Sequence, residues 1–370
     1  MKPFHIQDTL LGLKRNFSKR EGNANGVLLI SAGGLGDTVL FSLFAERFAS
    51  LARDGEPVTV LLRNDAAKMA FVLPKSIGLE IVNFKDLRKS LTYRRKIANR
   101  LYRAHYRLII STDQLRHPDL DEALIEMAAP EEAIAMEARS WPKYDAALKN
   151  NRQLFSRLYD SGPNRVDKVV RWNNFANWLT GSDNPPPKVK IDQGLVADAS
   201  PGETPDILIQ PFSAVNAKQS PVTLYKSIIE SLPKGLSIAI TGTPGDLNAN
   251  PEYNQLLDLP GVTFDSSTFQ ELAPALKAAN LVISVDTAAM HLAVALGAPT
   301  LCLASAAYVG EIVPYASDVT PDNAHVIYQT MACEGCLGKC HLEPIDDMYP
   351  CVAALDAERA VAKVKKLLFP

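Results

Sequence analysis

One stretch of this chain limits its possible folds more than any other. Residues 281–305, LVISVDTAAMHLAVALGAPTLCLAS, open with an apolar run, Leu281–Val285, that is typical of a buried parallel strand. Asp286 and Thr287 follow, and then comes a helical apolar pattern that a glycine and a proline end. A second apolar run, 300–303, completes a strand–helix–strand unit. We therefore predict an α/β protein whose ligands bind at the carboxyl ends of parallel strands.

Polar side chains stand at this predicted strand end. Thr287 and His291 are four residues apart, so they share one helix face beside Asp286. The first turn of a helix attracts phosphate through its free N–H groups and its dipole. In the simpler alternative, Asp286 and Thr287 only cap the helix and His291 is a core residue. The stretch is a candidate ligand site.

The same strand–helix pattern occurs in two sets, which Asn184-Pro185-Pro186-Pro187 separates. A length of 370 residues suits two domains, and the proline run fits neither a helix nor a central strand. We expect two Rossmann-like domains. The predicted division is a leader at 1–26, a first domain at 27–183, a linker at 184–205, a second domain at 206–355 and a C-terminal helix at 356–370.

Composition and charge argue against several classes of protein. The net charge of −2 gives no argument for a nucleic-acid partner, and no apolar run reaches the roughly 18 residues needed to span a bilayer. The first residues lack the pattern of a signal peptide, so we expect a cytoplasmic protein. The leader carries Lys14, Arg15, Lys19 and Arg20. It is either a solvated helix or a segment that rests on an anionic membrane surface.

A second basic segment is predicted as one helix over 85–107, after a short strand at Ile81–Phe84. Asp86 is its only acid. The positive charges either form a solvated face or attract an anionic acceptor or membrane surface. They come from Lys85, Arg88, Lys89, Arg94, Arg95, Lys96, Arg100, Arg103 and Arg107.

The first domain opens with a strand, Val27–Ser31, and a glycine-rich turn that ends in Gly36-Asp37. The spacing is not that of a dinucleotide fingerprint, and a Walker lysine is absent. Asp37 either caps the following helix or faces a bound partner. Further polar groups, 112–116, follow the predicted strand Leu108–Ser111.

The second domain adds two loops of the same kind. Lys218 follows the predicted strand Ile207–Gln210, where a lysine can meet a phosphate. Asp246 lies in a turn after a strand that ends at Thr241, where its carboxylate can bind ribose hydroxyls.

The segment DTAAMHLAVALGAPT resembles the signature of glycosyltransferase family 9, the ADP-heptose transferases of lipopolysaccharide assembly. The resemblance implies the GT-B fold, with two Rossmann-like domains facing a central cleft. It also implies an inverting, metal-independent transfer of a heptose or similar sugar from an ADP-sugar to a hydroxyl of a cell-surface glycan or glycolipid, most simply the lipopolysaccharide core. Alternatives are a protein acceptor, as in autotransporter heptosyltransferases, an epimerase, or a non-catalytic protein that binds nucleotide sugars.

The resemblance also assigns residues. It implies that Asp37 is the general base. Ala288 and Ser220 depart from the family pattern, where glycine and an aromatic residue are common. We also expect a peripheral contact with the inner membrane surface. Donor-binding residues would be Gly36, Ser213, Lys218, Gly242, Asp246, Asp286, Thr287 and His291, and acceptor-binding residues would be Asp113, Gln114 and Arg116.

Four cysteines fall in one short segment with the spacing C-x2-C-x3-C-x10-C. Four thiolates suit tetrahedral zinc or iron, and the resemblance adds that relatives which glycosylate autotransporters hold iron in such a cluster. The alternative is that the thiols are free or form disulfides. The candidate ligands are Cys333, Cys336, Cys340 and Cys351, and transfer itself would need no cofactor.

Overall fold

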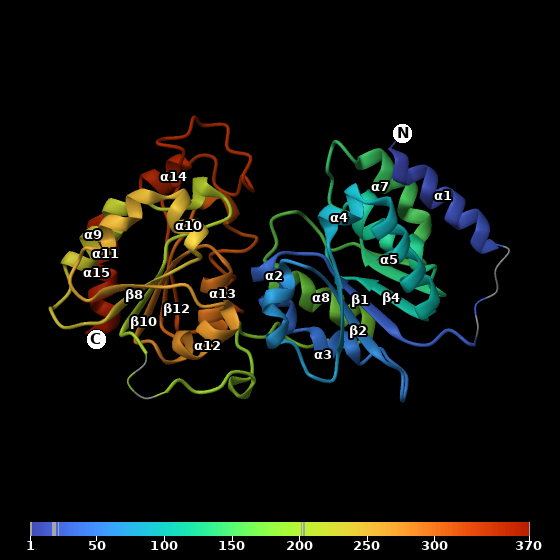
Figure 1. Cartoon of the computed structure of the whole chain (residues 1–370), viewed down its shortest axis with the longest axis horizontal. Helices are drawn as coiled ribbons and strands as arrows, with labels where there is room; N and C mark the ends of the chain where they lie inside the picture. Colours follow the sequence, from blue (N-terminus) through green and yellow to red (C-terminus); the bar gives the residue numbers. More distant parts are fainter. Residues whose placement is uncertain (1, 17–19, 21, 201, 203, 370) are drawn as a thin grey trace. The chain divides into compact units, whose positions relative to one another are not determined.

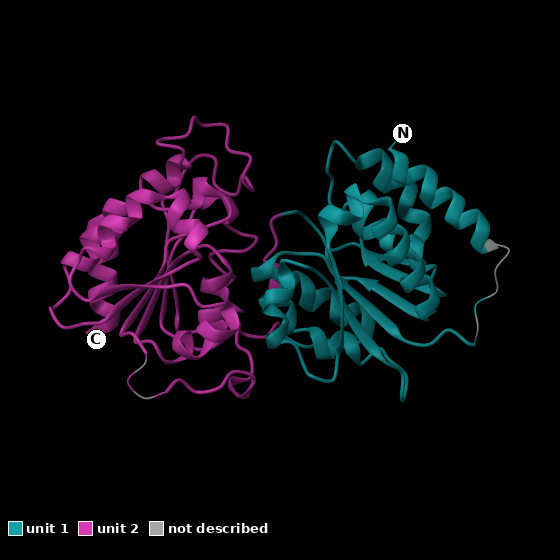
Figure 2. Ribbon diagram, viewed as in Figure 1, with its two compact units in different colours: residues 1–164, 171–185 teal, residues 165–170, 186–370 magenta. Residues whose placement is uncertain are grey.

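The computed structural model describes residues 2–16, 20, 22–200, 202 and 204–369. Lys19 of the predicted leader lies outside this range. The chain divides into two compact units (Figure 2): unit 1 comprises residues 1–164 and 171–185, and unit 2 comprises 165–170 and 186–370. Each unit is built on one six-stranded parallel sheet with helices on both faces (Figure 1). This is the α/β architecture of a GT-B protein.

The sheet of unit 1 has the order β3-β2-β1-β4-β5-β6. The chain begins at the central strand β1, adds β2 and β3 on one side, and then returns to add β4, β5 and β6 on the other. Its two central strands are wholly buried, as continuous apolar runs predict. The strands are β1 (Val27–Ser31), β2 (Val58–Arg63), β3 (Gly78–Val82), β4 (Leu108–Ser111), β5 (Glu132–Met136) and β6 (Arg157–Tyr159). The helices are α1 (Pro3–Asn16), α2 (Leu35–Ser42), α3 (Ala45–Ala49), α4 (Phe84–Lys89), α5 (Leu91–Ala104), α6 (Ala123–Ala128), α7 (Asp145–Asn151) and α8 (Lys168–Thr180), whose first three residues belong to unit 2.

The sheet of unit 2 repeats the plan in the order β12-β11-β10-β7-β8-β9. Helices α9 and α15 cover one face, where their apolar residues form a core with alternate residues of the central strands. The strands are β7 (Ile207–Gln210), β8 (Ile238–Thr241), β9 (Val262–Asp265), β10 (Leu281–Val285), β11 (Thr300–Leu303) and β12 (Ala324–Ile327). The helices are α9 (Val222–Glu230), α10 (Pro244–Ala249), α11 (Asn254–Leu257), α12 (Phe269–Ala278), α13 (Ala288–Ala295), α14 (Pro350–Ala353) and α15 (Ala357–Leu368).

The basic segment differs from the prediction. It forms two helices, because Ser90 is extended and its side chain caps the start of α5 by accepting a hydrogen bond from the Tyr93 N–H. The preceding strand ends at Val82, and Asn83 caps α4, so the predicted strand Ile81–Phe84 is displaced toward the N-terminus.

Part of the predicted basic face is also buried and paired. Arg94 forms an ion pair with Asp8 of α1 at 2.6 Å, and Arg107 pairs with Glu56 at 2.5 Å. The hydrogen-bonded Arg107 guanidinium lowers the pKa of Glu56 to about 2. Both acids are distant in sequence, so the local composition could not reveal them.

Candidate active site

Asp37 lies in the first turn of α2, immediately after the glycine-rich turn that follows β1. Its Oδ2 accepts a hydrogen bond from the Gly34 N–H at 2.7 Å, which closes the turn over Gly33. A Cβ at Gly33 would stand 2.5 Å from the Cβ of Asp37, so only glycine fits there. Gly36 lies in the same first helical turn. The carboxylate therefore has a fixed place at the carboxyl end of β1, where ligands of such sheets bind.

The loop after β4 is tied to this turn. Asp113 is buried, and its Oδ2 accepts a hydrogen bond from the Ala32 N–H at 3.0 Å. Gln114 is partly buried, and its carbonyl accepts a hydrogen bond from the Arg139 N–H. The structure thus brings Asp37 and two of the predicted acceptor-binding residues to neighbouring strand ends.

Arg116, the third predicted acceptor-binding residue, lies in a different environment. Its guanidinium is 2% exposed and donates to Glu122 at 3.0 Å and to the Met136 carbonyl at 2.5 Å. It also stands over the ring of Phe155. This geometry favours a role in holding the loop rather than direct contact with an acceptor.

The same loop buries a second carboxyl group. Asp121 accepts a hydrogen bond from the His117 N–H at 2.7 Å. Desolvation, and then the nearby Asp113, raise the pKa of Asp121 to about 7. A buried neutral carboxyl group is typical of a site where the charged form has no adequate partner.

The raised pKa of Asp121 predicts a pH-dependent stability. The folded state holds this proton more tightly than the unfolded state, so its contribution is full below about pH 4 and is lost as the pH rises through 7. The loss should be on the order of a few kcal/mol. Asp121→Asn keeps an oxygen for the His117 N–H but cannot titrate. We expect the denaturant midpoint of unit 1 to fall between pH 5 and pH 8 in the wild type and to fall less in the variant; equal slopes would contradict this assignment.

Unit 1 also contains a basic cavity of about 500 Å³. Phe4, Phe84 and Leu120 supply its apolar lining. Two of its cations are paired, Arg63 with Asp65 and Lys2 with Asp119. The cavity is thus both cationic and partly apolar, which suits an anionic group on an organic ligand. Its five cations are Lys2, Arg63, Lys85, Arg88 and Lys89.

In unit 2, the structure brings Lys218 to the end of β10. The Lys218 ammonium lies 2.8 Å from Oδ2 of the buried Asp286 and over the ring of Tyr308 at 4.8 Å. Asp286 directly precedes Thr287, the N-cap of α13. A lysine fixed beside the first turn of a helix is a combination that attracts phosphate.

His291 lies one turn into α13 and is buried. Its Nδ1 is 2.6 Å from the Tyr315 hydroxyl. Burial raises the pKa of Tyr315 well above its usual value, and the Tyr315 hydroxyl donates to the Met290 sulfur at 3.8 Å. Tyr315 was not among the predicted residues, and no local pattern points to it.

The remaining predicted donor-binding residues of unit 2 lie in the segments that follow β7 and β8. Ser213 is partly buried, and its Oγ accepts a hydrogen bond from the Val215 N–H. A Cβ at Gly242 would stand 2.5 Å from the Phe212 ring, so the turn after β8 needs glycine. Asp246 forms a capping box with Thr243 at the start of α10. Its Oδ2 accepts hydrogen bonds from the Thr243 N–H and hydroxyl, both at 2.7 Å.

The cysteine segment, residues 333–351, brings two of its four thiols together. The sulfur atoms of Cys333 and Cys340 are 3.8 Å apart, and Cys351 Sγ accepts a hydrogen bond from the Ala306 N–H. Desolvation, followed by Cys340, raises the pKa of Cys333. Within the described part of the chain, no group of three or more histidine, cysteine or acidic side chains has the geometry of a metal site.

This segment packs against the loop that carries Lys218. The Tyr349 N–H donates to the Ala217 carbonyl at 2.9 Å, and the Tyr349 hydroxyl donates to the Gly338 carbonyl. A Cβ at Gly338 would stand 3.1 Å from the hydroxyl of Tyr308, the ring beneath the Lys218 ammonium. The position of Lys218 therefore depends on residues more than a hundred positions downstream.

A family model for glycosyltransferase family 9 (heptosyltransferase) matches residues 138–341. The chain belongs to this family. The match spans the cysteine segment up to His341 and every predicted donor-binding residue of unit 2. No curated protein matches the chain by sequence.

Solved structures agree with the family 9 assignment at the level of the fold. The Escherichia coli heptosyltransferase WaaC with ADP has a TM-score of 0.68 and 16% identity, over 92% of this chain and 99% of that one. The E. coli ADP-heptose lps heptosyltransferase II has a TM-score of 0.67 and 14% identity, over 93% of this chain and 98% of that one. The iron-containing dodecameric glycosyltransferase TibC of enterotoxigenic E. coli H10407 has a TM-score of 0.55 and 14% identity, over 94% of this chain and 77% of that one. Among the described residues of this family 9 chain, no helix combines the length and apolarity needed to cross a bilayer.

Proposed function

We propose that this protein transfers a heptose, or a similar sugar, from an ADP-sugar to a hydroxyl group of an anionic cell-surface glycan, with inversion at the anomeric carbon. The observation that carries the proposal is the placement of Lys218 2.8 Å from Asp286 beside the first turn of α13. It is supported by membership of family 9. The direct test is incubation with ADP-heptose and other nucleotide sugars, followed by detection of released ADP and of the glycosylated product.

In this proposal unit 2 binds the donor. Negative charge builds on the diphosphate as the bond to the sugar breaks, and Lys218 with the N–H groups at the start of α13 would stabilise it. Because these groups supply positive charge, the scheme requires no divalent cation. Asp286 would hold the Lys218 ammonium in place, and His291 would help to orient a phosphate or a sugar hydroxyl.

Unit 1 would supply the base. The Asp37 carboxylate would take the proton of the acceptor hydroxyl as its oxygen attacks the anomeric carbon from the face opposite to ADP. Acceptor binding by Asp113 and Gln114 would then orient the hydroxyl.

The basic cavity of unit 1 supports the proposal of an anionic acceptor. A lining of five cations with Phe4, Phe84 and Leu120 favours an acceptor that carries carboxylate or phosphate groups next to apolar carbon. The lipopolysaccharide core is the glycan that we propose.

A second candidate is a protein acceptor. The cysteine segment and the similarity to the iron-containing TibC favour it. Supplying either a purified lipopolysaccharide core or a secreted-protein fraction to the enzyme, with labelled ADP-heptose, distinguishes the two through the fraction that acquires the label.

Lys218→Met tests the donor site. We expect ADP to bind about ten- to a hundredfold more weakly, because the variant loses the ammonium and leaves Asp286 buried without its partner. Lys226→Met, at an exposed lysine that pairs only weakly with Glu230 at 3.9 Å, is the matched control. Equal ADP affinity in all three proteins, measured by calorimetry, would remove Lys218 from the diphosphate site.

We also propose that the four cysteines hold a structural zinc or iron ion. The fit is favourable for one pair, because two thiolates on a tetrahedral ion with bonds of about 2.3 Å are about 3.8 Å apart, the separation of Cys333 and Cys340. The N–H of Ala306 that donates to Cys351 is typical of support around a ligating thiolate. Bound there, the ion would stiffen the segment behind Lys218 and take no part in the transfer.

Metal analysis tests this second proposal. The purified protein should contain close to one ion per chain, and Cys336→Ser should contain much less, because a closed four-thiolate site retains its ion. Cys302→Ser, at a cysteine buried in β11 outside the segment, is the control. Less than about 0.2 ion per chain in the wild type would end the metal hypothesis.

A further inference from the structure

Helix α1 leaves a stripe of three apolar residues exposed, although other apolar residues of the helix face unit 1. Ile6, Leu10 and Leu13 are 49%, 62% and 55% exposed. Their spacing of four and three residues places them on one face. A surface helix normally turns such a stripe toward the core and its charges toward water.

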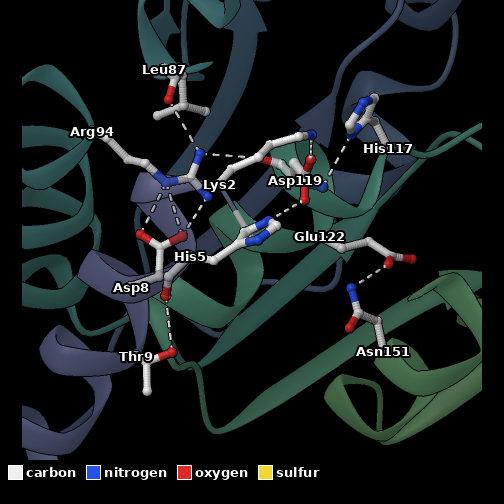
Figure 3. A network of polar contacts seen from close by, with 10 residues as sticks. All are labelled: Lys2, His5, Asp8, Thr9, Leu87, Arg94, His117, Asp119, Glu122 and Asn151. Carbon is white, nitrogen blue, oxygen red and sulfur yellow. Dashed lines mark hydrogen bonds and ion pairs between the residues drawn. The ribbon is translucent and has the colours of Figure 1, made fainter. Parts of the chain in front are cut away.

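The opposite face of α1 combines apolar and polar side chains and is fixed to unit 1: Phe4 is buried and Leu11 packs against the core. The Arg94 guanidinium binds the Asp8 carboxylate at 2.6 Å, and Arg15 donates to the carbonyls of Ala98 and Met127, both at 2.7 Å. Figure 3 shows Asp8 beneath Arg94, with Lys2 and His5 directed toward Asp119. These contacts would be lost if the helix rolled its apolar stripe inward, so the stripe stays exposed.

The exposed charges of α1 itself are positive, while the exposed Glu126 of α6 lies close enough to act on Arg15. The only acid of α1, Asp8, is turned inward against Arg94, whereas Lys2 and Lys14 near the two ends of the helix are exposed. Helix α1 packs on α5. The exposed cations of α5 are Arg95, Lys96, Arg100 and Arg103.

We propose that α1 docks unit 1 on an anionic lipid surface. Ile6, Leu10 and Leu13 would enter the boundary between headgroups and acyl chains, and the surrounding lysines and arginines would meet lipid phosphates. A second copy of the chain is a poorer occupant, because a symmetric contact through α1 would bring its cations together. The proposal does not rest on the proposed transfer reaction.

Docking through α1 would also affect the basic cavity of unit 1. Lys2, just before α1, and Phe4, in its first turn, line that cavity. The segment that contacts the lipid surface would therefore also form one wall of the anion site. An amphiphilic acceptor with an anionic head could reach the cavity while its apolar part stays in the membrane.

Co-sedimentation of the full chain with vesicles tests the proposal without donor or acceptor. We expect binding to vesicles of phosphatidylglycerol and phosphatidylethanolamine, weaker binding at high salt, and little binding to phosphatidylcholine. Leu10→Gln/Leu13→Gln should weaken binding to the anionic vesicles at least about tenfold, because two apolar side chains no longer enter the lipid. Ile345→Gln/Phe369→Gln removes two equally exposed apolar side chains from unit 2 and should leave binding unchanged.

Three results would overturn the proposal. These are no sedimentation of the wild type, equal sedimentation of the α1 variant, and equal loss in the unit 2 control. Analytical ultracentrifugation gives a fourth: a dimer that the α1 substitutions dissociate would make the stripe an interface between copies. Both substituted positions are exposed, so an unchanged melting temperature should accompany the loss of binding. ADP release from ADP-heptose decides the proposed function separately.

Discussion

Replacing Asp37 with asparagine is expected to lower the rate of sugar transfer by about 10²- to 10⁴-fold, the usual contribution of a general base. The asparagine oxygen can still accept the hydrogen bond from the Gly34 N–H, so the glycine-rich turn should keep its structure. What the variant loses is the ability to take a proton. Steady-state ADP release with saturating ADP-heptose measures the effect.

The controls separate chemistry from folding. ADP affinity and the melting temperature of Asp37→Asn should stay close to those of the wild type, since the predicted donor loop belongs to unit 2 and the backbone cap survives. Asp37→Ala, which loses the cap as well, should be similarly inactive and slightly less stable. Turnover of Asp37→Asn near the wild-type rate would exclude this carboxylate as the base.

Arg116→Ala is expected to destabilise unit 1 by about 3–5 kcal/mol, because it leaves the buried Glu122 carboxylate without its ion-pair partner. The three tryptophans of the chain, Trp141, Trp172 and Trp178, all lie in unit 1. Urea unfolding followed by tryptophan fluorescence therefore reports on this unit alone.

A second variant makes the Arg116 prediction specific. Arg116→Met/Glu122→Leu removes both charges and should recover much of the lost stability, since the cost arises from the unpaired carboxylate. If Arg116→Ala instead kept the wild-type urea midpoint and bound the acceptor poorly, Arg116 would be an acceptor ligand, as the family resemblance implies.

The sequence predicts the central strands of both sheets best. The bounds of β1, β4, β7, β10 and β11 agree with the predicted runs residue for residue. Central parallel strands are buried on both faces, so they read as continuous apolar runs between polar turns. The edge strand β3 lacks this signal because it is mostly exposed or half-exposed, and the predicted strand Ile81–Phe84 lies too far toward the C-terminus.

Long-range pairing limited what the sequence could reveal about side chains. Asp8 with Arg94, Glu56 with Arg107 and Lys218 with Asp286 are separated by about 50 to 90 positions, and periodicity carries no information about such partners. The raised pKa of Asp121 has the same origin, because it depends on burial that only the folded loop creates. Lys218 and Asp286 were grouped from the family resemblance rather than from spacing.

The tyrosine contacts behind Lys218 bear on how strongly the proposed donor would bind. Tyr349, which lies in residues 333–351, and Tyr308, which follows β11, both support the loop that carries Lys218. If unit 2 binds the donor as proposed, an insertion or a chemical change in residues 333–351 would shift the Lys218 ammonium without altering a residue proposed to bind the nucleotide. Natural variants that differ only in that surface segment should differ in their affinity for ADP while their cores remain interchangeable.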